Sequence, residues 1–266
     1  MVAPGAVGLI AGSGRLPELL AEAVKTQGRF LVVLTLEGTS SAAARLADHS
    51  HRVGADDLQR MLALLGEHQV RELVFAGNVP RITPIDRVAA SFRTMAAAGS
   101  QASGQRLFQR GIALLAERGI TVRGPLDVRP DLATPPGVLT TRGPAPEEWD
   151  DIRRGLAVAR LVAGEEIGQT VALRRGVVVA VEAAEGTDAA IHRAGTQTGG
   201  AVIVKAARPQ QDLRFDLPTA GPDTIDVMRA AGASALALEA GRTLLLDREA
   251  AIAAADAAGM AIVGVE

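Results

Sequence analysis

The 266-residue sequence contains no cysteine and no tyrosine, and aromatic residues make up only 2% of it. Without cysteine, the chain has no disulfides, no thiolate metal sites and no cysteine nucleophile, which fits a reducing compartment such as the cytoplasm. Scarce aromatic residues leave few stacking platforms, and a formal charge of -2 gives no basic surface. Nucleic-acid binding is therefore not expected.

Long hydrophobic runs are missing as well. No apolar stretch reaches the roughly 18 residues that a membrane-spanning helix needs. The first residues, MVAPGAVGLIAGSG, lack the basic region of a signal peptide. We therefore expect a cytoplasmic protein that touches a membrane, at most, at its periphery. The sequence also lacks a P-loop, a G-x-S-x-G elbow and histidines in metal-ligand spacing on a helix, so a histidine-built metal centre is not expected either.

The first half of the chain alternates apolar strands with amphipathic helices. Strands are predicted at 6–11, 30–38, 72–78 and 120–124, and helices at 16–28, 56–68 and 106–119. Strands joined by helices of this length indicate right-handed crossovers and a parallel sheet. Residues 1–130 are thus predicted to form a Rossmann-like α/β domain with helices on both faces of its sheet.

The residues that follow are rich in proline and glycine, and 131–146 is predicted to be a linker. A helix at 147–164 and a hairpin at 169–183, with its turn at Arg174–Gly176, begin the second half. Further apolar strands and two more helices lead to a last strand at 261–265. Residues 147–266 are therefore predicted to form a second, mixed α/β domain.

A glycine turn, AGSGRLP (11–17), follows the first strand and precedes the first helix. Backbone amides in such a turn can bind a phosphate or a sugar, and the helix N-terminus favours an anion. Glu37 stands where a dinucleotide fold would place its ribose acid, but Pro17 occupies the position of the third glycine. A phosphate or sugar contact, a dinucleotide site and a purely structural turn all remain open.

A second polar turn, FAGNVPR (75–81), ends the third predicted strand at the carboxyl edge of the sheet. Ligands of open parallel sheets bind at that edge. Asn78 and Arg81 are therefore candidates for contacting phosphate or a sugar hydroxyl. The alternative is a plain turn with an exposed arginine.

In the second half, EGTD (185–188) lies at a strand-to-helix junction. Glu185, Thr187 and Asp188 are candidate ligand-binding residues there. The alternative is that Thr187 or Asp188 is an ordinary helix N-cap.

The densest candidate site is VIVKAARPQQDLRFDLPTAGPDT (202–224). Lys205 and Arg208 follow a strand, and Asp212, Arg214 and Asp216 alternate along a segment expected to be extended, so that their side chains share one face. Cations for phosphate and a carboxylate for a metal or water suit phosphoryl transfer. The alternative is a surface ladder of ion pairs, followed by a helix with Asp223 as its N-cap.

Taken together, these motifs resemble a known family. The collinear series GLIAGSGRLP, FAGNVPR, EIGQTV, AVEAAEGTDA, VIVKAARPQQDLRFDLPTAG and ALEAGRTLLLDREA resembles the UDP-2,3-diacylglucosamine pyrophosphatases of the LpxI type over nearly the whole chain. The resemblance implies two domains with the lipid substrate in a cleft between them, and a homodimer. It also implies hydrolysis of UDP-2,3-diacylglucosamine, dependent on Mg²⁺ or Mn²⁺, to UMP and lipid X in lipid A synthesis.

The resemblance also assigns residues. It makes Asp216 the essential carboxylate, which either binds the metal or orients the attacking water. It also assigns substrate binding to a larger set of residues: Gly12, Ser13, Gly14, Leu16, Asn78, Gln169, Glu185, Thr187, Asp188, Lys205 and Gln211. Two departures stand out. Arg208 replaces a second lysine, and the stretch ASGQRLFQR (102–110) lacks two acids of a GDD that family members commonly carry.

Two other functions stay open on the sequence. A nicotinamide-dependent oxidoreductase would use the glycine turn and Glu37. A non-catalytic protein that binds a nucleotide sugar or a lipid would explain the missing acids. A diacyl substrate would further require an apolar groove and contact with the cytoplasmic face of the inner membrane, which no motif locates.

Overall fold

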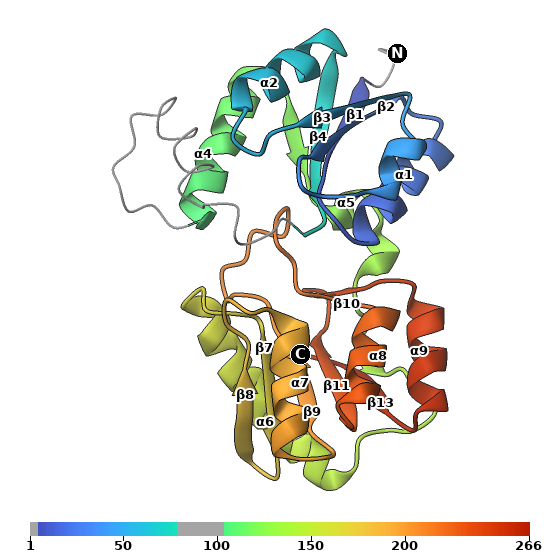
Figure 1. Ribbon diagram of the computed structural model, residues 1–266, viewed down its shortest axis with the longest axis vertical. Helices are drawn as coiled ribbons and strands as arrows, with labels where there is room; N and C mark the ends of the chain where they lie inside the picture. The colour runs from blue at the N-terminus through green and yellow to red at the C-terminus, as the bar shows by residue number, and fades with distance from the viewer. Residues whose placement is uncertain (1–4, 79–103) are drawn as a thin grey trace. The chain divides into compact units, whose positions relative to one another are not determined.

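The computed structural model describes residues 5–78 and 104–266 (Figure 1). The chain divides into two compact units, residues 1–130 and 131–266. Each has its own hydrophobic core: one cluster of described residues gathers around Leu73 in the first unit, and two gather around Ile203 and Val204 in the second. The predicted fold class of two α/β units is confirmed.

The first unit is built on a five-stranded parallel sheet with the order β3-β2-β1-β4-β5. The strands are β1 (Ala6–Ala11), β2 (Leu31–Leu36), β3 (His49–Val53), β4 (Val70–Ala76) and β5 (Thr121–Arg123). The central strands β1 and β2 are buried throughout, as their unbroken apolar sequences predict. The edge strand β3 has the sequence HSHRV and is mostly exposed, so it has no apolar pattern from which a strand could be predicted.

Helices cover both faces of this sheet (Figure 1). One face carries α1 (Leu16–Thr26) and the short α5 (Pro125–Val128), which contact each other. The other face carries α2 (Leu58–Glu67) and α4 (Gly104–Glu117), whose apolar side chains join one core cluster with the sheet. A 3₁₀ turn at Ala42–Arg45 leads into β3.

The second unit contains a mixed sheet with the order β6-β13-β11-β9-β7-β8. Its strands are β6 (Gly137–Val138), β7 (Thr170–Arg174), β8 (Val177–Val181), β9 (Val202–Lys205), β11 (Ala235–Glu239) and β13 (Ala261–Val265). The strands β9, β11 and β13 are parallel, while β7 runs antiparallel to β9. Two short strands, β10 (Thr219–Ala220) and β12 (Leu244–Leu245), form a separate parallel pair in the same unit.

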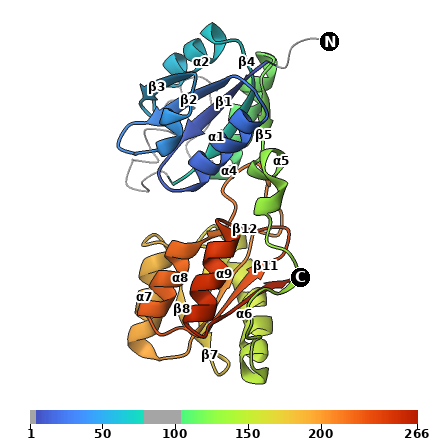
Figure 2. The same cartoon turned by 90° about the vertical axis from the view of Figure 1, so that its right-hand side faces the viewer.

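Helices again cover both faces (Figure 2). The long helix α6 (Pro146–Gly164) packs on one face, against β7 and β9. The other face carries α7 (Thr187–Gln197), α8 (Pro222–Ala230) and α9 (Arg248–Ala257). Gly155 lets α6 approach β9 closely, since a Cβ at this position would lie 2.6 Å from Val204 Cγ2.

The segment 131–146, predicted to be a linker, instead belongs to the second unit. Its residues 137–138 form β6, which pairs with β13. Thr134 accepts a hydrogen bond of 2.8 Å from the Thr243 hydroxyl, and Ala133 O accepts one of 2.7 Å from Arg248. Proline and glycine removed any periodicity from this segment, but its polar backbone groups still find partners within the unit.

Candidate functional site

In the first unit, the two predicted turns meet at the carboxyl ends of the adjacent strands β1 and β4. Ser13 N donates to Asn78 O over 2.9 Å, and Asn78 N donates back to Ser13 O over 2.8 Å. Gly12 N is also paired, with Ala76 O at 2.8 Å. The backbone amides of Gly12, Ser13 and Asn78 are therefore satisfied within the protein and do not face a phosphate.

Two glycines permit this close approach. A Cβ on Gly12 would lie 2.5 Å from Asn78 O, and one on Gly77 would lie 2.7 Å from Ser13 O. Gly77 also has φ +89°, a left-handed conformation that glycine adopts without strain. Gly14 differs, because its φ is +101° but the space around it is open. Gly14 and Leu16, at the start of α1, therefore stay candidates for contact through the backbone. Ser13 and Asn78 stay candidates through their side chains, and Gly12 through the shape that it gives the turn.

Two further predictions concern this edge of the first unit. Glu37 follows β2 and is exposed. Arg81 lies outside the described residues, so its predicted contact stays a prediction.

In the second unit, the side chain of Lys205, the last residue of β9, contacts the side chains of two threonines from other elements. The Lys205 side chain is buried, and its Nζ donates to the hydroxyls of Thr170 and Thr187, each over 2.8 Å. Thr170 begins β7 and pairs with Lys205 across the antiparallel ladder, and Thr187 begins α7. The predicted residues Lys205 and Thr187 thus form one cluster.

The predicted carboxylate lies in the loop after β9, surrounded by other predicted residues. Arg208 Nη2 donates to Asp216 Oδ2 over 2.9 Å, and Gln169 Nε2 donates to Asp216 O over 3.0 Å. Gln211 Nε2 donates to Phe215 O over 2.6 Å. The Asp216 side chain is 48% exposed, and its backbone has φ +53°. Left-handed conformations in residues other than glycine often mark functional positions.

The loop is not extended as predicted. Asp212 accepts hydrogen bonds from Arg214 N at 3.0 Å and Arg214 Nε at 2.9 Å, and Phe215 N closes a turn onto Asp212 O. The hydrogen bond from Arg214 also holds the pKa of Asp212 below its ordinary value. Asp212 and Asp216 therefore do not share one extended face. A short aspartate that bonds its own backbone favours a turn over a strand.

The capping predictions also need correction. Gly221, not Asp223, is the N-cap of α8, and its N–H donates to Thr224 Oγ1 over 3.3 Å. Gly186, with φ +88°, is the N-cap of α7, so Thr187 stands inside the helix and its hydroxyl is available to Lys205.

The other two members of the EGTD motif lie at the surface. Glu185 forms an ion pair of 2.7 Å with Arg193, whose hydrogen bond lowers the pKa of this carboxyl. Asp188 is exposed in the first turn of α7.

Sequence reasoning missed three residues of this edge. Thr170 is one. The other two are buried acids at the ends of apolar strands. Glu182 follows β8 and accepts the Gln169 N–H at 3.2 Å, and Glu239 ends β11 and accepts the Ala207 N–H at 2.8 Å. An acid at the end of an apolar strand, as in AVEA and ALEA, is the signal that could have found them.

The predicted metal can be compared with this set of side chains. Across 5–78 and 104–266, no group of three or more histidine, aspartate or glutamate side chains could hold an ion. Mg²⁺, however, keeps several waters and is often bound by one or two carboxylates together with substrate phosphates. A single half-exposed carboxylate, Asp216, fits that way of binding.

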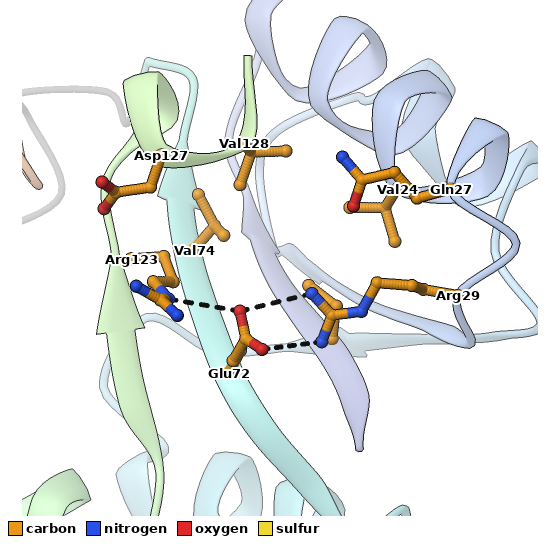
Figure 3. Close-up of a pocket in the computed structure, with 9 residues that line it drawn as sticks. Val24, Gln27, Arg29, Glu72, Val74, Arg123, Asp127 and Val128 are labelled. Carbon is orange, nitrogen blue, oxygen red and sulfur yellow. Dashed lines mark hydrogen bonds and ion pairs between the residues drawn. The ribbon is translucent and has the colours of Figure 1, made fainter. Parts of the chain in front are cut away.

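The first unit also contains a small polar pocket between α1, α5 and the sheet (Figure 3). Glu72 lies at its centre, with Arg29 at 2.8 Å and Arg123 at 3.2 Å. The hydrogen bond from Arg29 is the main cause that holds the pKa of Glu72 below its ordinary value. No predicted site residue lines this pocket, and Glu72 is paired with both of its arginines.

In the part of the chain that the structure describes, no helix is long and apolar enough to cross a membrane.

Comparison with known proteins places both units. Residues 6–132 match the LpxI N-terminal domain, and residues 135–263 match the LpxI C-terminal domain. The UDP-2,3-diacylglucosamine pyrophosphatase LpxI of Caulobacter vibrioides is 34% identical over 98% of this chain and 97% of its own.

Two of the matches with solved structures have low identity and low TM-scores. N5-carboxyaminoimidazole ribonucleotide synthetase from Thermotoga maritima is 16% identical over 67% of this chain, with a TM-score of 0.28, and the match spans 41% of that protein. Leucoanthocyanidin reductase from Vitis vinifera, solved with NADPH, is 15% identical over 44% of this chain and 48% of its own, with a TM-score of 0.28.

The prediction of function is corrected by these matches. It left open a nicotinamide-dependent oxidoreductase and a non-catalytic binding protein, and both alternatives are wrong, because the full-length relative is named as a pyrophosphatase. The structure also argues against an oxidoreductase, because the amides of Gly12 and Ser13 in the glycine turn already donate to backbone carbonyls.

Proposed function

The chain belongs to the LpxI family, and we propose that it hydrolyses the phosphoanhydride of UDP-2,3-diacylglucosamine. The observation that carries the proposal is the polar edge of the second unit. Lys205 ends β9 and donates to Thr170, and the loop that follows pairs Arg208 with Asp216. Two cations and one accessible carboxylate are what an attack of water on a pyrophosphate requires.

The reaction balances with these groups. The oxygen of water forms a bond to the sugar-side phosphorus, and the bond from that phosphorus to the bridging oxygen breaks. UMP leaves with the bridging oxygen, and the diacylglucosamine 1-phosphate, lipid X, keeps the oxygen of water. A proton of water passes to solvent or to the leaving phosphate.

Each residue has a distinct role in the proposal. Asp216 lies half exposed, so its carboxylate can contact either the attacking water or a bound Mg²⁺. Lys205 and Arg208 offset the charge that develops on the phosphate oxygens. When bound, Mg²⁺ or Mn²⁺ would add Lewis-acid polarisation of a phosphoryl oxygen. Gln169 and Gln211 hold the backbone on either side of the carboxylate in place.

We also propose how the protein assembles and where it meets its lipid substrate. The proposal is a homodimer and a peripheral contact with the cytoplasmic face of the inner membrane. Gly12, Ser13, Gly14, Leu16, Asn78 and Arg81 would act on the substrate from the first unit. The missing acids near 102–110 make uridine or metal binding the step in which this enzyme would differ from other family members.

The test is an assay of the purified protein with UDP-2,3-diacylglucosamine and Mg²⁺. Release of UMP and lipid X in equal amounts supports the proposal, and a metal-free reaction with a chelator tests the cation. Wild-type protein that releases no UMP would refute the proposed reaction. An Asp216→Asn variant with wild-type activity would refute only the role of Asp216.

A further inference from the structure

Three of the four histidines of the chain gather at one edge of the first unit. His51 lies on β3 and His68 follows the last turn of α2. Their Nε2 atoms face each other at 2.9 Å. The ring of His49 stacks on that of His68, with centroids 4.5 Å apart and an interplanar angle of 23°.

Local structure explains this gathering. Along β3, side chains alternate between faces, so His49 and His51 point to the same face as Val53, which packs in the core beneath α2. His68 is the C-cap of α2, and Gln69 follows with φ +51°, which turns the chain toward β4. The proposed hydrolysis uses none of these rings.

We propose that His51 and His68 bind one divalent ion of a late first-row transition metal, nickel or copper. A hydrogen bond between the two Nε2 atoms requires that one of them lack a proton, and an unprotonated imidazole nitrogen is the form that binds a metal. A metal ion would replace the shared hydrogen, and each ring would turn by roughly 45° so that its nitrogen lone pair points at the ion and no longer at the other nitrogen.

The donor set indicates the class of metal. Imidazole nitrogen suits nickel, copper and zinc, and affinity for divalent ions rises through Ni²⁺ to Cu²⁺ and falls again at Zn²⁺. Zinc sites typically have three or four protein ligands, so two imidazoles completed by water favour Ni²⁺ or Cu²⁺. No third histidine, aspartate or glutamate joins them within the described ranges, so water would complete the coordination.

The site has a mechanical consequence for the fold. A metal bound to both rings would link the edge strand β3 to the end of α2. Both histidines are only partly buried, so the ion could exchange with solvent. The site is independent of Asp216, which lies in the other unit.

The test is calorimetric titration of the full chain, without a histidine tag, with NiCl₂. We expect one ion per chain in the wild type, and binding weakened more than about tenfold in His51→Phe and in His68→Phe, since even changes behind the ligands typically cost that much. Phenylalanine keeps a ring for stacking and removes only the nitrogens. His192→Ala, in the second unit, is the matched control and should bind as the wild type does, as should Asp216→Asn.

A second measurement is independent of affinity. With Cu²⁺, the electron paramagnetic resonance spectrum of the wild type should show coupling to two imidazole nitrogens, and that of either variant to one. Absence of a bound ion in the wild type, or unchanged binding in the His51→Phe/His68→Phe double variant, would overturn the proposal.

Discussion

The guanidinium of Arg208 holds the carboxylate of Asp216 at 2.9 Å, although the Asp216 backbone is in the left-handed region with φ +53°. Asparagine tolerates that conformation better than alanine does, because its short polar side chain can hydrogen-bond locally. Asp216→Asn therefore changes the charge and leaves the loop intact.

We expect Asp216→Asn to lose nearly all UMP release while its free energy of unfolding stays within about 0.5 kcal/mol of the wild type, as for most surface substitutions. Urea unfolding and an assay of UMP check the two halves of the prediction. Asp216→Ala is a less clean variant, since it adds backbone strain of about 1 kcal/mol. A large loss of stability in Asp216→Asn would mean that the carboxylate is structural.

The Lys205 ammonium gives a second prediction. Thr170→Val removes one of the two hydroxyls that accept hydrogen bonds from its Nζ. A buried donor that loses a partner typically costs about 1–3 kcal/mol, and the ammonium is free to shift. We expect a lower kcat together with that loss of stability.

Thr170→Ser keeps the hydroxyl and serves as the control. It should retain most of the kcat. If Thr170→Val and Thr170→Ser have the same kcat, the hydroxyl does not position Lys205.

Two glycines of the first unit should respond differently to alanine. Gly77→Ala combines φ +89° with contacts of 2.7 Å to Ser13 O and 2.8 Å to the Pro17 ring, so both strain and steric overlap oppose it. Gly14→Ala adds only strain, because no atom lies within 4 Å of the new Cβ.

Strained left-handed residues cost about 1–3 kcal/mol. Gly14→Ala should fall at the low end of that range and Gly77→Ala at or beyond its high end, as measured by urea unfolding. Equal losses would show that the turn between β1 and β4 relaxes around the added methyl group.

The ion pairs of Glu72 predict a pH dependence of stability. Hydrogen bonding to Arg29 holds the folded-state pKa of Glu72 below its ordinary 4.5. The carboxylate therefore contributes stability above about pH 4.5, and this contribution is lost as the pH falls through the lowered pKa.

Glu72→Gln should be less stable than the wild type at neutral pH, and the difference should shrink in acid. Unfolding by urea at pH 7 and at pH 3 measures it. A difference that does not change with pH would assign the effect to packing.

Much of the fold could be predicted from sequence, because its strands are buried on both faces. The strands β1 and β13 were predicted with the residues they have in the structure. The edge strand β3 and the two-residue β6 were missed, since their sequences carry no apolar pattern and tertiary pairing alone defines them.

The site divides in the same way. The positions of Lys205 at the end of a strand and Thr187 at the start of a helix predict both as candidate site residues, and the family resemblance singles out Asp216 among the acids of its loop. Thr170 and Glu239 were missed because their roles depend on pairing between strands distant in sequence. The turn at Asp212 was mistaken for an extended segment, because alternating charges do not reveal that Arg214 bonds its close neighbour.

The separate cores of the two units bear on how the chain melts. Three core clusters of described residues lie within 1–130 or within 131–266, so each half carries apolar burial that can drive its own cooperative transition. Scanning calorimetry should resolve two transitions. Core substitutions such as Leu65→Ala and Ile203→Ala would each lower only one of them, and the gene could be divided after codon 130 into two expressible halves.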